Sequence, residues 1–393
     1  MQDVNDMQLE VPISLIRGGS AYWVQEKTRL IQPSHWNLGR RLPFAIVITW
    51  LPLVVLAALH GSAHSSGDLG ALLSDYRVYA RIFVAIPLLL LGQITMESHF
   101  REMSQHFLDA DLVRTGDLPR FRKIMEKARR LRDAKWPEIL ILIGVYLQIG
   151  YFLQSGRLHY ASWAAEAGSN SPTPAGYYAM FVAHAFFLGL LALVLWKWVI
   201  WVLVLRDLSQ LDLQLDSTDG DLTAGLGFLG EVPKAFVPLV LAISAVIGAT
   251  WRAQVLEGAA NLGSYKMPVA LLAVIILLIF FLPLLLFTPK LMREKKEGSL
   301  KYRSLQHLHS LQFRRKWMYG RNEHVEKLLG TPDVTSLADM STSFKNVEDM
   351  IVFPFKKKVA IGLLVGLAVP MMPALTAKIP VRELLKSLLE ALH

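Results

Sequence analysis

Apolar and polar residues along this chain alternate in long blocks rather than residue by residue. The longest apolar block covers residues 177–205 and contains one formal charge, Lys197. A helix rises about 1.5 Å per residue, so this block is longer than a bilayer's hydrocarbon core of roughly 30 Å. A backbone inside that core has no water to bind and must form its own hydrogen bonds. The block is therefore predicted to be a membrane-spanning helix.

Further blocks of the same character predict a bundle of such helices. Two predicted spans fall in each of three segments: 43–97, 137–205 and 233–288. A last span at 359–378 contains Pro370 and Pro373, and it either crosses the membrane or re-enters on the same side. The predicted fold is all-α: a polytopic helical membrane bundle of about seven transmembrane helices with a helical cytoplasmic layer.

The polar segments between the blocks differ in their content of lysine and arginine. Residues 98–136 carry ten and residues 289–358 carry fifteen, whereas 61–78 and 155–177 carry one each. Lysine and arginine resist translocation, so the rich segments and the N-terminus are predicted to be cytoplasmic. The predicted cytoplasmic layer has four parts: an N-terminal segment at 1–42, a helical hairpin at 98–136, an acidic glycine-rich loop at 206–232 and a basic helical segment at 289–358, with an amphipathic helix around 299–318.

The end of the chain and its composition add little to this picture. Residues 379–393 have leucines at helical spacing and predict an amphipathic helix that lies on a membrane or packs on a neighbour. The net charge of +9 is explained by the cytoplasmic loops and by attraction to anionic headgroups, so lipid rather than nucleic acid is the predicted partner. The chain contains no cysteine, which excludes disulfides, thiol catalysis and cysteine metal sites.

Polar residues inside the predicted spans are the first functional candidates, because such residues are costly in lipid. His184 and Lys197 lie in the fourth span, Gln148 in the third, and Gln93 and Glu97 near the inner end of the second. They are candidates for lining a pathway. The alternatives are a hydrogen bond to a neighbouring helix for His184, snorkelling to the inner interface for Lys197, and solvation at the helix end for Glu97.

The acidic segment at 206–232 gives a second set of candidates, Asp216, Asp219 and Asp221. Carboxylates at the inner mouth of a pathway concentrate cations. The alternative is that they cap helices and pair with the basic cytoplasmic helices. The sequence leaves both interpretations open.

Three glycines in the same segment, Gly225, Gly227 and Gly230, match the pattern G-x-G-x-x-G. Dinucleotide binding needs a strand before this pattern and a helix after it, whereas here acidic residues precede it and a membrane span follows. We therefore reject nucleotide binding and predict a tight glycine loop or hinge where the chain turns under the membrane. His307 and His309 point apart on a helix and make no metal site. No cofactor, metal ligand or catalytic residue is predicted, and the enzyme question stays open, leaning towards no enzyme.

The second half of the chain resembles a known group of proteins. Its landmarks are GLGFLG at 225–230, LGTPDVTSLAD at 329–339, the proline-broken last span and IPVRELL at 379–385. This layout is similar to that of a group of bacterial membrane proteins usually labelled only as hypothetical. The resemblance implies the bacterial inner membrane and implies no activity. The multi-pass topology with a cytoplasmic N-terminus is predicted from the apolar blocks and the lysine and arginine counts above.

Two functional hypotheses follow from these features. The first is an oligomeric channel or carrier for ions or a small solute, formed as a homo-oligomer because seven helices make a small bundle. The second is a non-transporting scaffold or signalling protein whose segments 98–136 and 289–358 bind a cytoplasmic protein partner or anionic lipid. A lipid-modifying enzyme is a third, weaker hypothesis.

Overall fold

The computed structural model describes Gly18, Lys27 and residues 37–64, 68–155, 163–166, 171–258, 261–319 and 332–375. The described residues form helices and their connections, with two isolated β-bridges. Among them, seven helices are long and apolar enough to cross a membrane, which confirms the predicted fold class. Most of the predicted N-terminal segment 1–42 and the predicted C-terminal helix 379–393 lie outside the described residues.

Several of the seven membrane-span candidates combine more than one helical type. The first four are α2 (Leu38–His64); α4 (Tyr76–Tyr79), the π-helical turn η1 (Ala80–Ala85) and α5 (Ile86–Asp109); α7 (Trp136–Ser155); and α8 (Pro174–Tyr178), the π-helical turn η3 (Ala179–His184) and α9 (Ala185–Leu208). The last three are the 3-10 helix η4 (Gly227–Phe236) with α10 (Val237–Leu256); a continuous run from the 3-10 turn η5 (Leu262–Tyr265) through α11 (Lys266–Phe281) and the 3-10 helix η6 (Leu282–Phe287) to α12 (Thr288–Trp317); and α14 (Lys357–Leu375).

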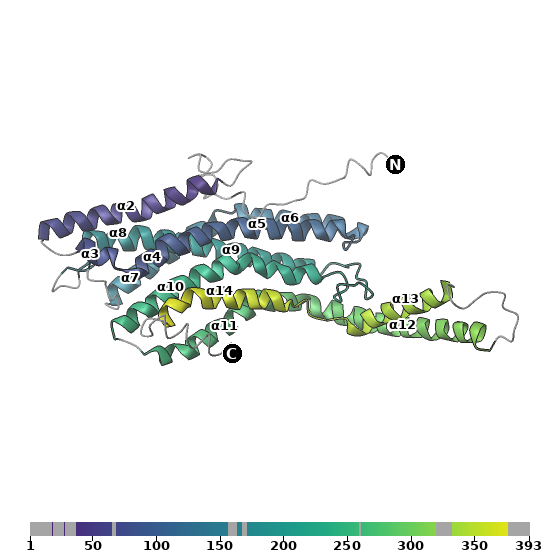
Figure 1. Cartoon of the computed structure of the whole chain (residues 1–393). Helices are drawn as coiled ribbons and strands as arrows, with labels where there is room; N and C mark the ends of the chain where they lie inside the picture. The colour runs from purple at the N-terminus through teal and green to yellow at the C-terminus, as the bar shows by residue number, and fades with distance from the viewer. Residues whose placement is uncertain are drawn as a thin grey trace.

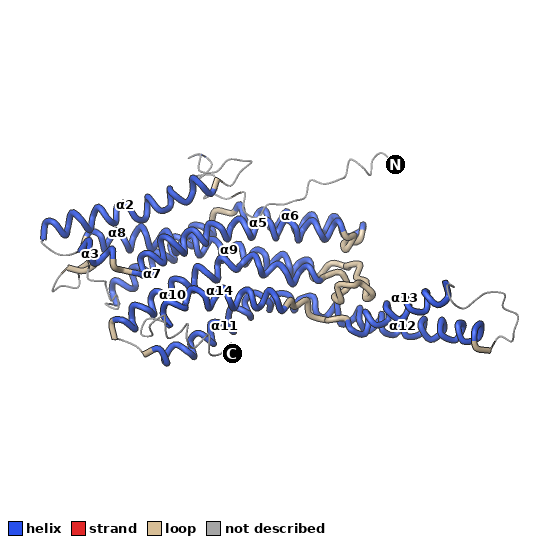
Figure 2. Tube along the Cα trace, viewed as in Figure 1, coloured by secondary structure: helices blue, strands red, loops and turns tan. Residues whose placement is uncertain are grey.

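The remaining helices lie at the two ends of the bundle. They are α3 (Asp68–Leu73), the 3-10 turn η2 (Thr115–Asp117), α6 (Leu118–Asp133) and α13 (Pro332–Asp349). We call the end that carries residues 209–226 the acidic-loop end, and the opposite end, which carries α3, the α3 end. Figures 1 and 2 show the long helices side by side between these ends, with α12 and α13 projecting from the acidic-loop end.

The segment predicted as a hairpin at 98–136 consists of the extension of α5 and the basic helix α6. Helix α6 buries Phe121, Met125 and Ala128, while its basic residues other than Arg132 are exposed. Lys127 Nζ donates to Asp207 Oδ2 at 2.7 Å, which ties α6 to the end of α9. The hairpin is therefore packed against the bundle rather than detached from it.

Helix α12 is longer than the sequence indicates. It begins at Thr288 instead of near residue 299, and it continues η6 without a break. The Thr/Ser-rich stretch that follows forms α13, which packs back along α12. Lys316 Nζ contacts Asp333 Oδ2 at 2.6 Å where the two helices join.

Helix α14 runs parallel to α10 over its whole length. Lys356 pairs with Glu231 at one end, and Arg252 donates to the Pro373 carbonyl at the other, at 3.0 Å. Between them, Ser244 Oγ donates to the Leu367 carbonyl at 2.7 Å. Helix α14 is one of the seven membrane-span candidates, and the choice between a crossing and a re-entrant last span stays a prediction.

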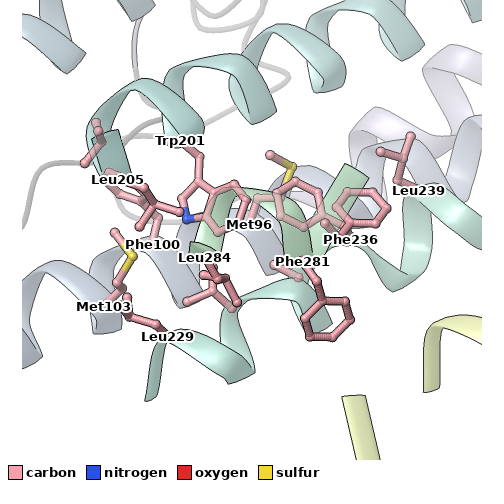
Figure 3. Close-up of a cluster of buried hydrophobic side chains, with 14 of the residues drawn as sticks. Met96, Phe100, Met103, Trp201, Leu205, Leu229, Phe236, Leu239, Phe281 and Leu284 are labelled. Carbon is pink, nitrogen blue, oxygen red and sulfur yellow. The ribbon is translucent and has the colours of Figure 1, made fainter. Parts of the chain in front are cut away.

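A continuous apolar core fills the bundle towards the acidic-loop end. Figure 3 shows methionines and aromatic rings of α5, α9 and η4 lying together. The Trp201 and Phe236 rings are 5.5 Å apart, and the Phe236 and Phe280 rings stack at 4.7 Å. Apolar side chains of several helices therefore pack together at this level of the bundle.

Candidate functional site

A cavity of about 210 Å³ lies near the α3 end, between the second and fourth spans. Arg81 of η1 and His184 of η3 both line it. Its wall also contains Trp163, a buried residue of the described segment 163–166 between the third and fourth spans. The π-helical turns η1 and η3 therefore meet at one cavity, and such turns occur often at functional sites.

Sequence reasoning singled out His184 but not Arg81, although the charge of Arg81 inside the predicted second span was the available signal. Arg81 Nε and His184 Nδ1 are both buried, and neither has a hydrogen-bond partner within the described structure. The Arg81 guanidinium lies 5.9 Å from the centre of the Phe187 ring. The structure thus brings a guanidinium to the predicted histidine.

A second group of polar residues lies deeper in the bundle. Arg41 Nη2 donates to Gln93 Oε1 at 2.8 Å, and both side chains are buried. Glu97 is buried one turn further along α5, and the charges of Glu97 and Arg41 act on Lys197. Three residues singled out separately from the sequence thus lie near one level of the bundle with Arg41, within electrostatic range of one another. We call Arg41, Gln93, Glu97 and Lys197 the charged layer.

Gln148 does not join this group. It is exposed on α7, whose surface is otherwise largely apolar and exposed. Within one chain it faces neither cavity. A role in lining a pathway would require a second copy of the chain and stays a prediction.

A larger cavity of about 670 Å³ opens at the acidic-loop end. It is lined by Asp216, Asp219 and Asp221, as well as by side chains of α5 that sequence reasoning did not single out: His99, Glu102 and His106. The available signal was their spacing, because residues three or four apart share one face of a helix. The acidic loop and the extension of α5 thus form one surface.

The carboxylate of Asp221 is occupied by its own loop. Its Oδ1 accepts from the amides of Thr223 and Gly225, at 2.7 and 3.1 Å, and its Oδ2 accepts from the amide of Gly227 at 2.7 Å. The Thr223 hydroxyl also donates to Oδ2 at 2.8 Å. Partial burial alone would raise the pKa of Asp221, but these hydrogen bonds lower it below its ordinary value. This geometry resembles a helix cap more than an open cation site.

The other two aspartates also accept hydrogen bonds within the loop. Asp216 Oδ1 accepts from the amide and hydroxyl of Thr218, at 2.9 and 2.7 Å, and Asp219 Oδ1 accepts from the Asp221 amide at 2.9 Å. Their side chains stay exposed to solvent. Their predicted action on cations remains a prediction.

Gly225, Gly227 and Gly230 lie where other atoms come close to the backbone. Gly225 has φ +86°, a conformation that favours glycine. A Cβ on Gly227 would lie 2.9 Å from Asp221 Oδ2, and one on Gly230 would lie 2.6 Å from the Pro354 carbonyl oxygen. These contacts give the glycines a packing role, and their role as hinges stays a prediction.

The polar residues at these two cavities match no metal site among the described residues and no known protein. Across the described ranges, no group of three or more His, Asp or Glu side chains is placed to hold a metal ion. The chain matches no protein-family model, no curated protein and no solved structure. The resemblance to hypothetical bacterial membrane proteins therefore stays a prediction.

Proposed function

We propose that this integral polytopic membrane protein is a carrier for an ion or small solute. The observation that supports the proposal is the placement of polar groups along one pair of spans, the second and the fourth. The small cavity lies at one end of this pair, and the larger cavity lies at the other, against the extension of α5. The charged layer lies between the cavities. Charged side chains at such depth are costly and typically serve a pathway.

The packing between the cavities favours a carrier over an open channel. Leu89 and Leu90 of α5 and Leu190 and Val194 of α9 separate the small cavity from the charged layer, and all four are buried. A solute can pass only if these helices move apart, as in alternating access. We call these four residues the apolar barrier.

The proposal includes an orientation. We infer that the acidic-loop end faces the cytoplasm of a bacterial inner membrane. The support is the high lysine and arginine content of α6, of α12 and of residues 356–358, which lie at this end. The predicted homo-oligomer is supported by Gln148, because a second copy covering α7 would remove this amide from lipid.

The test is flux through the purified protein in liposomes, with a panel of cations, anions and protons under an imposed potential. We expect selective, protein-dependent flux. Lys197→Met and Glu97→Gln should each reduce it about tenfold or more, which corresponds to a barrier change of roughly 1.4 kcal/mol. Lys345→Met, which removes an exposed charge from α13, is the matched control and should leave flux unchanged.

Two results would contradict the carrier. One is the absence of flux for every ion in the panel from protein shown to be folded and inserted. The other is wild-type flux in both charged-layer variants, which would remove Glu97 and Lys197 from the pathway.

A second candidate function, a scaffold for a cytoplasmic protein, is favoured by the α12–α13 hairpin. The hairpin projects from the bundle and exposes Leu300, Leu305 and Leu308. Helix α12 has 30 residues, a length of about 45 Å, so its tip lies several Debye lengths from the headgroups of its own membrane. A protein partner therefore suits this surface better than anionic lipid.

The scaffold is tested by replacing these leucines together with aspartate in the intact protein. Recruitment of one dominant partner by the wild type, lost in the triple variant, would support it. Equal recovery of that partner by both proteins would contradict it.

A further inference from the structure

The small cavity near the α3 end contains a guanidinium whose charge is not balanced by its surroundings. Arg81 Nε is buried and lacks a hydrogen-bond partner among the described residues. His184 Nδ1 of η3 is also buried without a hydrogen-bond partner among the described residues. The Arg81 charge acts on this imidazole. Buried cations are normally paired, because desolvation penalises an isolated charge.

The nearest carboxylate is already engaged. Asp75 Oδ1 accepts from Arg77 Nε at 3.0 Å, and Asp75 Oδ2 accepts from Trp163 Nε1 at 3.0 Å. Among the described lining residues, the charged groups are thus this one carboxylate and the guanidiniums of Arg77 and Arg81. Arg77 also pairs with Glu257 at 3.6 Å, so both carboxylates beside this cavity are engaged by Arg77, and neither forms an ion pair with Arg81 among the described residues. A bound anion would supply the Arg81 guanidinium with a counter-charge.

The size and walls of the cavity suit a small ligand. Its volume of about 210 Å³ equals roughly seven water molecules at about 30 Å³ each. Leu53 and Ile82 give it apolar walls, while the face of the Phe187 ring lies against the Arg81 guanidinium. A planar guanidinium held in this way can bind the two oxygens of a carboxylate or phosphate together.

We propose that this cavity binds a small anion through a carboxylate or phosphate group, held by the Arg81 guanidinium with His184 as a second contact. The inference concerns binding and does not rest on the proposed transport. The anionic group comes either from a soluble ion or from a lipid headgroup, and the experiment below separates these sources.

The experiment measures thermal unfolding of the full chain in nanodiscs of zwitterionic phosphatidylcholine. Inorganic phosphate and succinate are titrated against chloride at equal ionic strength. We expect the unfolding midpoint to rise and saturate with phosphate or succinate beyond the effect of chloride, because a ligand that binds only the folded state stabilises it. His184→Leu should raise the apparent Kd several-fold.

Arg81→Met distinguishes a binding role from a structural one. We expect this variant to lose the anion-dependent rise and to unfold, without anion, at the same temperature as the wild type or higher, because it removes a buried unbalanced charge. If it does not fold, Arg81→Lys replaces it, since lysine keeps the charge but loses the two-pronged contact and should bind more weakly. Lys266→Met removes an exposed charge at the same end of the bundle and should keep the full wild-type response.

The lipid arm repeats the measurement in nanodiscs that contain phosphatidylglycerol, without soluble phosphate. Stabilisation by this lipid in the wild type, but not in Arg81→Met, would identify a headgroup as the source. The proposal is overturned if phosphate, succinate and phosphatidylglycerol all leave the wild type unchanged. It is also overturned if Arg81→Met responds like the wild type.

Discussion

At the scale of single residues, the acidic loop shows how one carboxylate can organise a turn. Leu222 and Ala224 have φ of 56° and 53°, values that are uncommon outside glycine. Asp221 holds this conformation by accepting from the amides on either side of Ala224 and from Gly227. The Ile351 amide then donates to the Leu222 carbonyl at 2.6 Å. The loop is thus fixed from within and by the segment before α14.

Replacing Asp221 with asparagine should loosen this loop. The new amide would put a donor where Oδ2 now accepts, so we expect a loss of about 1 to 3 kcal/mol in unfolding free energy. Faster hydrogen exchange of the Thr223, Gly225 and Gly227 amides is the measurement. Asp219→Asn is the control. The Asp219 carboxylate accepts from only one of the loop amides, so this substitution should reduce the unfolding free energy by less. Equal exchange in the two variants would contradict the role of Asp221.

The contribution of Asp221 should also depend on pH in a defined direction. Its pKa is lowered in the folded state, so its stabilisation is present above the ordinary value of about 3.9 and is lost as pH falls through the lowered pKa. The difference in unfolding midpoint between wild type and Asp221→Asn should therefore be full at neutral pH and shrink below about pH 4. A difference that is constant across this range would contradict the ionised carboxylate.

At the scale of helices, prolines inside the spans are compensated by neighbouring side chains. A proline cannot donate to the carbonyl four residues before it. Pro52 frees the Ile48 carbonyl, which accepts from the Tyr178 hydroxyl at 2.5 Å. Pro370 frees the Gly366 carbonyl, which the buried Ser244 hydroxyl approaches to 3.5 Å while it donates to Leu367. These prolines therefore mark helix contacts and do not by themselves indicate a pathway.

The contact between α10 and α14 can be tested at Ser244. Ser244→Ala leaves buried carbonyls without this donor, and we expect a loss of roughly 0.6 to 2 kcal/mol in unfolding free energy. Thr250→Val is the matched control, because the Thr250 hydroxyl bonds within its own helix. Equal midpoints for Ser244→Ala and the wild type would show that the hydroxyl contributes nothing to the pairing.

The sequence predicts the spans well because lipid demands long apolar blocks, and it predicts polar candidates because charges in such blocks stand out. It does not predict that η1 and η3 are π-helical, because no local residue pattern requires it. The electrostatic interaction of Glu97 with Lys197 depends on how α5 packs on α9. The hydrophobic periodicity of the sequence does not specify that packing. The sequence does not predict that α12 continues directly from η6, because Pro289 suggests a break in the helix. Proline is nevertheless tolerated in the first turn of a helix, where Pro289 lies.

At the scale of the whole molecule, the two ends of the bundle are expected to lie on opposite sides of the membrane. Since the chain lacks cysteine, single cysteines report sidedness directly. Ser74 is exposed at the α3 end, and Gly220 is exposed at the acidic-loop end. We expect Ser74→Cys to react with an impermeant reagent in intact cells, and Gly220→Cys to react only after permeabilisation. The reverse pattern would invert the orientation.

In the proposed carrier, solute crosses between the two cavities through the apolar barrier, and a cysteine in place of Leu190 reports whether that barrier opens. Leu190 is buried between the small cavity and the charged layer, so labelling there requires the helices to separate. We predict that Leu190→Cys, in otherwise wild-type protein in liposomes, reacts slowly with an impermeant thiol reagent and reacts faster during flux. No reaction under any condition, from folded protein in which Ser74→Cys or Gly220→Cys reacts readily, would contradict the carrier.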